Sequence, residues 1–223
     1  MDKKDRVAVV MGGPSKEREV SLNTGNAILN ALKEKGYDAV AIDLDPEHIV
    51  DQLKASGAKV VFNAVHGLYG EDGRLQGILE MLGIPYTGSG VLASALAMDK
   101  VYTKHLFQNN HVPTAKCIFL DKKRDQDPKD RILKEIGIPC VVKPATQGSS
   151  IGVVIVKDEK QLDDALQEAF QYGDHVLCEA FFTGKEVAAG VMMEEDGRAI
   201  PMPLVLIEPH VNFYDFHNKY TKG

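Results

Sequence analysis

The sequence contains no tryptophan and only three cysteines in 223 residues. Cys117, Cys140 and Cys178 are widely spaced, odd in number and embedded in apolar runs. A disulfide framework or a cysteine zinc site needs paired or closely spaced cysteines, so reduced core thiols in a reducing cytoplasm are expected. The seven histidines show no HxxxH or HxH spacing, which leaves a histidine metal site without support.

Long apolar runs and a basic surface are also missing. No run is long enough to span a bilayer, and the first residues lack the apolar core and cleavage pattern of a secretory signal. The 26 Lys and Arg against 32 Asp and Glu give a formal net charge of −6. Because a duplex nucleic-acid surface normally carries a clustered Lys/Arg face, nucleic acid is not an expected partner. Without a run long enough to span a bilayer, a membrane is not an expected partner either.

The N-terminal part of the chain alternates between short apolar runs and helical periodicity. Gly, Pro or Asp, which are frequent in turns, mark each change. Such alternation is typical of βαβ units and predicts a parallel sheet flanked by helices. The expected strands are residues 7–11, 38–44 and 59–65, and the expected helices are residues 20–35, 46–56 and 72–83.

The remainder predicts a mixed α+β unit. One long helix is expected from residue 91 to about 109, with a domain boundary between residues 88 and 112. The predicted fold class is therefore α/β, a Rossmann-like parallel sheet followed by an α+β domain. The expected strands are residues 115–120, 139–143, 152–157, 175–182, 186–194 and 199–207, with a helix at residues 159–171.

Residues 138–152 join an apolar strand, a lysine and a loop of Gly, Ser and Thr. A lysine such as Lys143, at the end of a β-branched run, is costly to bury unless it meets an anion. Gly148 and Gly152 allow backbone N–H groups to turn toward that anion. The segment predicts a nucleotide phosphate site, and a plain hairpin whose lysine reaches solvent is the alternative.

Two glycine patterns known from other nucleotide sites do not fit. No Walker A pattern occurs, and residues 88–93 match the dinucleotide fingerprint GxGxx(G/A) only locally. The fingerprint requires an acidic residue about twenty positions further on, after the next strand, whereas here a helical pattern continues to Asn109. A nicotinamide-dependent oxidoreductase is kept only as an alternative.

Two more candidates follow the first and third expected strands. Residues 12–21 pass from a glycine turn into a helix start, so Glu17 either faces a ligand or complements the helix dipole, as expected of Glu19. His66 lies at the carboxyl edge of the expected sheet, where open α/β sheets bind ligands. A histidine capping its own turn is the alternative.

A pair of carboxylates, Glu179 and Glu186, flanks an apolar run that ends at Gly184. This pattern predicts two strands meeting at a turn. Such a strand edge can bind a purine base, with Glu186 accepting hydrogen bonds from ribose hydroxyls. The alternative is an ordinary hairpin whose two acidic side chains are solvated. Lys100 and Lys143 are then the phosphate-binding cations.

Seven segments, in order, resemble the D-alanine–D-alanine ligase family of the ATP-grasp superfamily. They are residues 12–21, 66–77, 85–90, 97–100, 142–144, 148–152 and 213–220. The resemblance implies an ATP-grasp fold with an N-terminal substrate-binding domain (residues 1–98), a central subdomain (99–182) and the start of a C-terminal subdomain with a lid loop (183–223). The family's C-terminal third is expected to follow Gly223.

The resemblance also implies an activity. The family joins two D-alanines through an acyl phosphate to make D-Ala-D-Ala for peptidoglycan, using ATP and magnesium or manganese, in the cytoplasm and commonly as a homodimer. The metal ligands and the oxyanion-binding arginine would follow Gly223, so no residue of this chain is expected to bind metal. A catalytically silent fragment that retains substrate or nucleotide binding is the alternative.

Site residues carry over position by position. The resemblance implies that Glu17 binds the ammonium of the first D-alanine and forms hydrogen bonds with Ser149 and Tyr220, and that His66 lies near its carboxylate. Tyr220 also indicates an amino acid as second substrate, because D-lactate-using relatives tend to carry phenylalanine there. The implied nucleotide-binding residues are Lys100, Lys143, Ser149, Ser150, Glu179, Ala180, Phe181, Phe182, Glu186 and Lys219.

Overall fold

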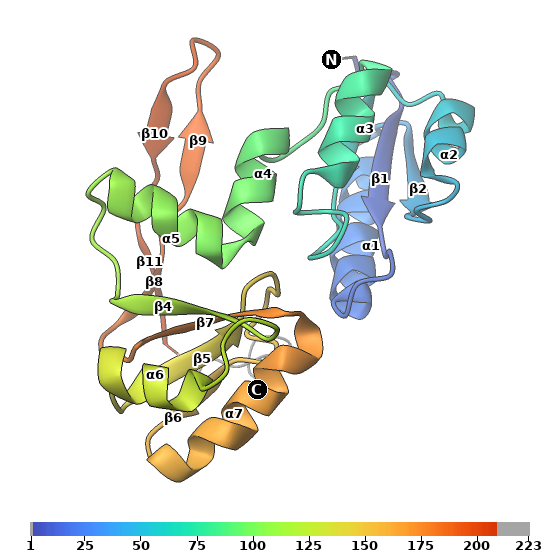
Figure 1. Ribbon diagram of the computed structural model, residues 1–223. Helices are drawn as coiled ribbons and strands as arrows, with labels where there is room; N and C mark the ends of the chain where they lie inside the picture. Colours follow the sequence, from blue (N-terminus) through green and yellow to red (C-terminus); the bar gives the residue numbers. More distant parts are fainter. Residues whose placement is uncertain (1, 209–223) are drawn as a thin grey trace.

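The computed structural model describes residues 2–208 and contains two separate larger sheets (Figure 1). The first is parallel, in the order β2-β1-β3, and is formed by β1 (Val7–Met11), β2 (Ala39–Asp43) and β3 (Val60–Asn63). Every residue of the central strand β1 is buried, which explains its uninterrupted apolar sequence. The three strands lie where the sequence predicts them.

Helices cover both faces of this sheet: α1 (Arg18–Glu34), α2 (Ile49–Ser56) and α3 (Arg74–Leu82). Side chains alternate between the faces along a strand. Val7, Val9 and Met11 therefore pack in one core cluster with Leu29 of α1. Ala8 and Val10 belong to a second cluster that contains residues of α2 and α3.

The expected long helix over residues 91–109 is instead two helices, α4 (Val91–Met98) and α5 (Lys100–Asn109), which meet at an angle (Figure 1). Asp99 between them is extended, with φ −92° and ψ 108°. Its side chain accepts hydrogen bonds from the N–H groups of Val101 and Tyr102 and caps α5. The prediction of one helix was wrong because the helical pattern continues across this cap.

The second sheet is antiparallel, in the order β4-β7-β5-β6. It consists of β4 (Cys117–Asp121), β5 (Cys140–Pro144), β6 (Val154–Val156) and β7 (His175–Ala180). The helices α6 (Pro128–Glu135) and α7 (Leu162–Ala169) share one core cluster with it. The sequence analysis missed α6, a charged helix of which only Ile132 is buried.

Single 3-10 turns flank α7 at Glu159–Gln161 and Phe170–Tyr172, so the segment predicted as one helix over residues 159–171 is divided and ends one residue later. The three cysteines are free thiols. Within residues 2–208, no helix combines the length and the apolar character needed to cross a membrane.

Four short strands complete the described chain: β8 (Glu186–Ala188), β9 (Val191–Met193), β10 (Ala199–Pro201) and β11 (Val205–Ile207). They form two two-stranded sheets, β10-β9 and β11-β8. The predicted single strands 186–194 and 199–207 are thus each divided in two. The predicted turn that joins the strands of Glu179 and Glu186 is also wrong, because β8 pairs with β11 and not with β7.

Candidate functional site

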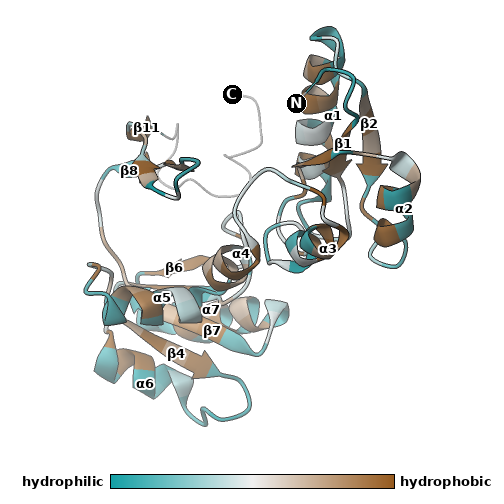
Figure 2. Ribbon diagram, turned by 90° about the horizontal axis from the view of Figure 1, so that it is seen from above, coloured by the Kyte–Doolittle hydropathy of each residue, from teal (hydrophilic) through white to brown (hydrophobic). Residues whose placement is uncertain are grey.

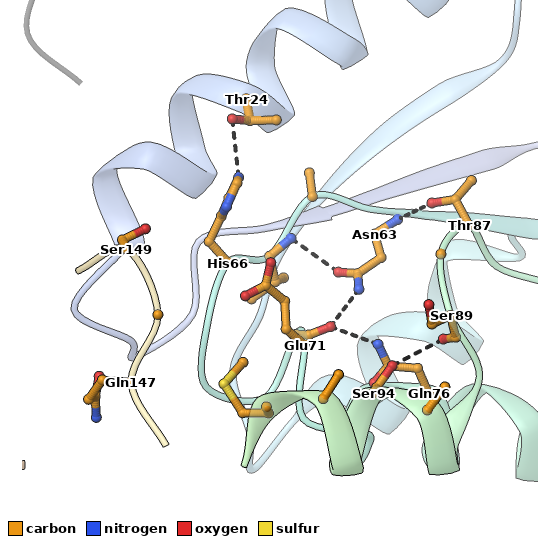
Figure 3. Close-up of a pocket in the computed structure, with 18 of the residues that line it drawn as sticks. Thr24, Asn63, His66, Glu71, Gln76, Thr87, Ser89, Ser94, Gln147 and Ser149 are labelled. Atoms are coloured by element: carbon orange, nitrogen blue, oxygen red, sulfur yellow. Dashed lines mark hydrogen bonds between the residues drawn. The ribbon is translucent and has the colours of Figure 1, made fainter. Parts of the chain in front are cut away.

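A cavity of about 860 Å³ lies between the loop after β3, helix α4 and the loop after β5 (Figure 3). Its volume falls within the range of about 300–1,000 Å³ typical of small-molecule sites. The polar groups that line it include Thr24, Asn63, His66, Glu71, Gln76, Lys100, Lys143, Gln147 and Ser149. The cavity therefore collects side chains from both larger sheets and from the helices between them.

Two side-chain amides, one part-buried and one buried, hold the loop after β3. The side-chain nitrogens of Asn63 and Gln76 both donate to the carbonyl oxygen of Gly70, each at 2.7 Å. The carboxylate of Glu71 accepts a hydrogen bond from the N–H of Gly67 at 2.8 Å. These contacts hold the loop that carries His66, and the sequence analysis did not identify Asn63 or Gln76.

His66 lines the cavity at the carboxyl edge of the parallel sheet (Figure 3). Its Nε2 lies 3.3 Å from the hydroxyl oxygen of Thr24 on α1. Its carbonyl oxygen accepts a hydrogen bond from the Ser15 hydroxyl at 2.8 Å. The imidazole is thus held at a ligand-accessible edge by a neutral partner.

Glu17 is only 4% exposed and is not one of the residues that line the cavity, although it contacts the lining residue Ser149. The hydroxyl of Ser149 donates to its carboxylate. Gly67 also packs closely here, since a Cβ at that position would lie 2.6 Å from Glu17 Oε2. The carboxylate therefore links the first helix start to the loop after β5.

That loop adopts an uncommon backbone conformation. Ser149 and Ser150 have φ values of 48° and 60°, in the left-handed region that non-glycine residues rarely occupy. Both serines line the cavity. Strained residues of this kind cluster at ligand-binding segments, which agrees with the sequence prediction of a binding loop.

Lys100 and Lys143 extend into this same cavity. The ammonium of Lys100 donates to the carbonyl oxygen of Gln147 at 2.5 Å. Burial, reinforced by the positive charge of Lys143, lowers the pKa of Lys100 to about 8. Two cations held this close favour an anionic ligand, because an anion removes their mutual repulsion.

The structure adds a third lysine that the sequence analysis missed. Lys104 lies one turn after Lys100 on α5, and its ammonium is 2.8 Å from Glu179 Oε2. The other carboxylate oxygen of Glu179 is paired with Lys143. The only sequence signal for Lys104 is its spacing of four residues from Lys100, which puts both on one helix face.

The residues expected to contact adenine and ribose do not line this cavity. Phe182 is 72% exposed, and Glu186 lies on the exposed strand β8. The N–H groups of Ala180 and Phe181 donate to the carbonyl oxygens of Lys116 and Pro139. Two further expected site residues, Lys219 and Tyr220, lie outside the described residues.

Within the described part of the chain, no group of three or more His, Cys, Asp or Glu side chains is arranged to hold a metal ion. The carboxylates near the cavity are already engaged, Glu71 by a backbone N–H and Glu179 by two lysines. Residues 2–208 therefore do not fit a divalent metal site.

Comparisons with known proteins agree with this geometry. The family model "D-ala D-ala ligase N-terminus" matches residues 6–53 and 47–89, and "D-ala D-ala ligase C-terminus" matches residues 106–223. A curated D-alanine–D-alanine ligase from Pelotomaculum thermopropionicum is 47% identical, over 98% of this chain and 69% of the relative. A second from Moorella thermoacetica is 44% identical, over 98% of this chain and 71% of the relative.

Solved structures give the same relationship. D-alanine–D-alanine ligase from Bacillus anthracis complexed with ATP has a TM-score of 0.77 and 33% identity, over 94% of this chain and 68% of that one. D-alanyl-alanine synthetase A from Vibrio cholerae has a TM-score of 0.80 and 27% identity, over 99% of this chain and 72% of that one. A parallel sheet followed by this antiparallel sheet defines an α/β protein of the ATP-grasp class. The chain belongs to the D-alanine–D-alanine ligase family and spans about 70% of the length of these curated relatives.

Proposed function

We propose that this chain is a D-alanine–D-alanine ligase polypeptide that uses ATP to join two D-alanines for peptidoglycan synthesis. One observation carries the proposal: Lys100 and Lys143 meet in one cavity with the strained Ser149–Ser150 loop, in a chain 47% identical to a curated ligase. Two cations and a serine loop suit the phosphates of a nucleotide.

The proposed reaction has two steps. A carboxylate oxygen of the first D-alanine attacks the γ-phosphorus of ATP, which gives an acyl phosphate and ADP. The amine of the second D-alanine then attacks the acyl carbon, and the tetrahedral intermediate expels inorganic phosphate as the amine loses a proton. Lys100 and Lys143 neutralise phosphate charge, a contribution that dominates phosphoryl transfer.

For the substrates, we assign the ammonium of the first D-alanine to Glu17 and its carboxylate side to His66. Because Ser149 covers the Glu17 carboxylate, this role requires the serine loop to move aside or to share the carboxylate. The proposal includes Tyr220 and Lys219 in the lid, Ser150 at the phosphates, and residues 179–182 with Glu186 at adenine and ribose. A magnesium or manganese ion belongs to the proposed reaction, and residues 2–208 do not supply a site for it.

The proposed organisation keeps the boundaries expected from the sequence: residues 1–98 bind D-alanine, residues 99–182 bind the nucleotide phosphates, and residues 183–223 begin the C-terminal subdomain. Family membership further supports a cytoplasmic homodimer. Sedimentation of the purified chain at micromolar concentration tests the dimer, and a single monomeric species would contradict it.

The decisive experiment measures ADP formation from ATP as a function of D-alanine concentration. D-alanine-dependent ADP release is the expected result. A silent binding fragment, favoured by the absence of a metal site in the described residues, would bind ATP without releasing ADP. Calorimetric ATP binding measured beside the turnover assay separates these two cases.

Replacement of Lys143 by alanine tests the phosphate site. Removing one of two converging cations should weaken ATP binding at least tenfold, about 1.4 kcal/mol. Lys134→Ala is the control, because Lys134 lies on α6 and forms an exposed pair with Asp130. Equal ATP affinity in the two variants would remove Lys143 from the proposed site.

A further inference from the structure

Lys104 is a buried lysine that does not reach the cavity. The residue is 8% exposed, and its ammonium is held by three acceptors. They are Glu179 Oε2 at 2.8 Å, the Thr114 hydroxyl oxygen at 2.6 Å and the Ala115 carbonyl oxygen at 3.2 Å. Since an ammonium group has three hydrogens to donate, Lys104 has no donor left for a ligand.

Glu179 connects this lysine to the cavity. Its side chain is 14% exposed and lies between Lys104, with 10% exposure, and Lys143, with 19%. Only Lys143 of the two lysines lines the cavity. The carboxylate of Glu179 is thus shared by two cations. Lys104 is fixed and out of reach of a ligand, whereas Lys143 faces the cavity.

Binding of a phosphate to Lys143 would remove part of the positive charge that neutralises Glu179. When Lys143 turns toward an anion, it weakens its pair with Glu179, and a buried carboxylate without a partner is strongly destabilising. Lys104 removes that penalty because it continues to neutralise Glu179. Lys143 can then exchange partners without leaving an unpaired buried charge.

We infer that Lys104 is a positioning residue, a permanent counter-ion that holds Glu179 so that Lys143 is available to nucleotide phosphate. The inference rests on the proposed function in one respect, that the anion bound by Lys143 belongs to ATP. The link from Lys104 through Glu179 to Lys143 stands on the contacts alone.

A measurement without nucleotide tests the first half. Burial raises the pKa of Glu179, but the charge of Lys143 and hydrogen bonds from Lys104 and Lys143 lower it more, so the net pKa lies below its ordinary value. Lys104→Met should raise the pKa of Glu179, whereas Lys104→Arg should leave it low. Carboxyl ¹³C NMR as a function of pH measures this pKa. An unchanged pKa in the methionine variant overturns the counter-ion role.

Nucleotide binding tests the second half. Lys104→Met should weaken ATP binding about tenfold, as expected for neighbouring charges that couple. Lys104→Arg should keep affinity within about threefold, because it retains the charge. The matched control is Lys116→Met, which alters an exposed lysine on the segment leading into β4.

A double-mutant cycle separates positioning from a merely structural contribution. In the Glu179→Gln background no carboxylate competes for Lys143, so Lys104→Met should cost little additional ATP affinity. An equal loss in both backgrounds overturns the inference. If the unchanged chain binds no ATP, the proposed function fails, while a raised Glu179 pKa in Lys104→Met still supports the counter-ion role.

Discussion

Lys100 is a partly buried amine that faces a second cation, and its pKa falls to about 8 because burial disfavours the charge and Lys143 repels it. A bound polyphosphate offsets both causes, since the anion stabilises the protonated amine. The free chain therefore holds fewer protons on Lys100 than the complex does whenever the pH is near or above that value.

ATP binding should consequently take up protons. At a pH near the Lys100 pKa we expect uptake of about half a proton per chain, and the affinity should fall as the pH rises further. Calorimetric titrations in two buffers with different ionisation enthalpies measure this number. Lys100→Met should abolish the uptake, and an unchanged value in that variant would assign it to another group.

Gly67 illustrates a backbone requirement at the site. It has a φ of 70°, and a Cβ would lie 2.6 Å from Glu17 Oε2. Gly67→Ala should destabilise the fold by about 2–3 kcal/mol, measured by urea unfolding. Gly36→Ala, at φ 81° with open space around it, carries only the left-handed cost of about 1 kcal/mol. Equal losses of stability in the two variants would mean that the Glu17 side chain moves aside for the new methyl group at little cost.

The site was predictable where residue type alone restricts the chemistry. A lysine ending an apolar strand and a histidine after a parallel strand both indicate a ligand, and Lys143 and His66 do line the cavity. Lys104 was not predictable, because a lysine on a short helix resembles a solvated one until the partner strand is placed. The resemblance implied only nucleotide binding for Glu179, and its pairs with two lysines became visible only once the strand was placed.

At the scale of elements, the βαβ part was predictable because its buried strands and amphipathic helices carry strong periodic signals. The errors arose where a single residue interrupts a pattern. Asp99 divides the helical segment of residues 91–109 by capping α5 with its side chain. A cap of this kind depends on one φ/ψ pair, and periodicity does not register it.

Strands β8 to β11 differ from the rest in their burial. Val191 and Met193 on β9 are 66% and 64% exposed, and Val205 on β11 is 61% exposed. Figure 2 shows β8 and β11 apart from the four-stranded sheet and bearing hydrophobic residues. Two-stranded sheets are marginally stable in water, so these strands contribute little stability by themselves.

Hydrogen exchange should distinguish the two kinds of sheet. We expect the amides of β9 and β10 to exchange at least tenfold faster than those of β5 and β7, whose core residues are fully buried. Mass spectrometry of peptic peptides gives both rates in one experiment. Comparable protection in the two sheets would show that something covers the exposed strands in solution.

At the scale of the whole molecule, the cavity exists only where two separately built sheets meet. Helices α4 and α5 connect them in sequence, and Lys100 at the start of α5 bonds to the loop of the second sheet through the carbonyl of Gln147. The sequence indicated both units, but their relative placement depends on the Asp99 break. A straight helix over residues 91–109 would have directed the second sheet elsewhere.

The hydrogen bond from Ser149 to Glu17 joins residues 132 positions apart in the chain. Contacts of such high sequence separation carry a loop-closure cost and form only after the intervening segments are organised. During synthesis, the first sheet can assemble long before the serine loop has left the ribosome. The nascent polypeptide therefore becomes able to recognise its ligand late, when the start of the first helix and the serine loop come into contact.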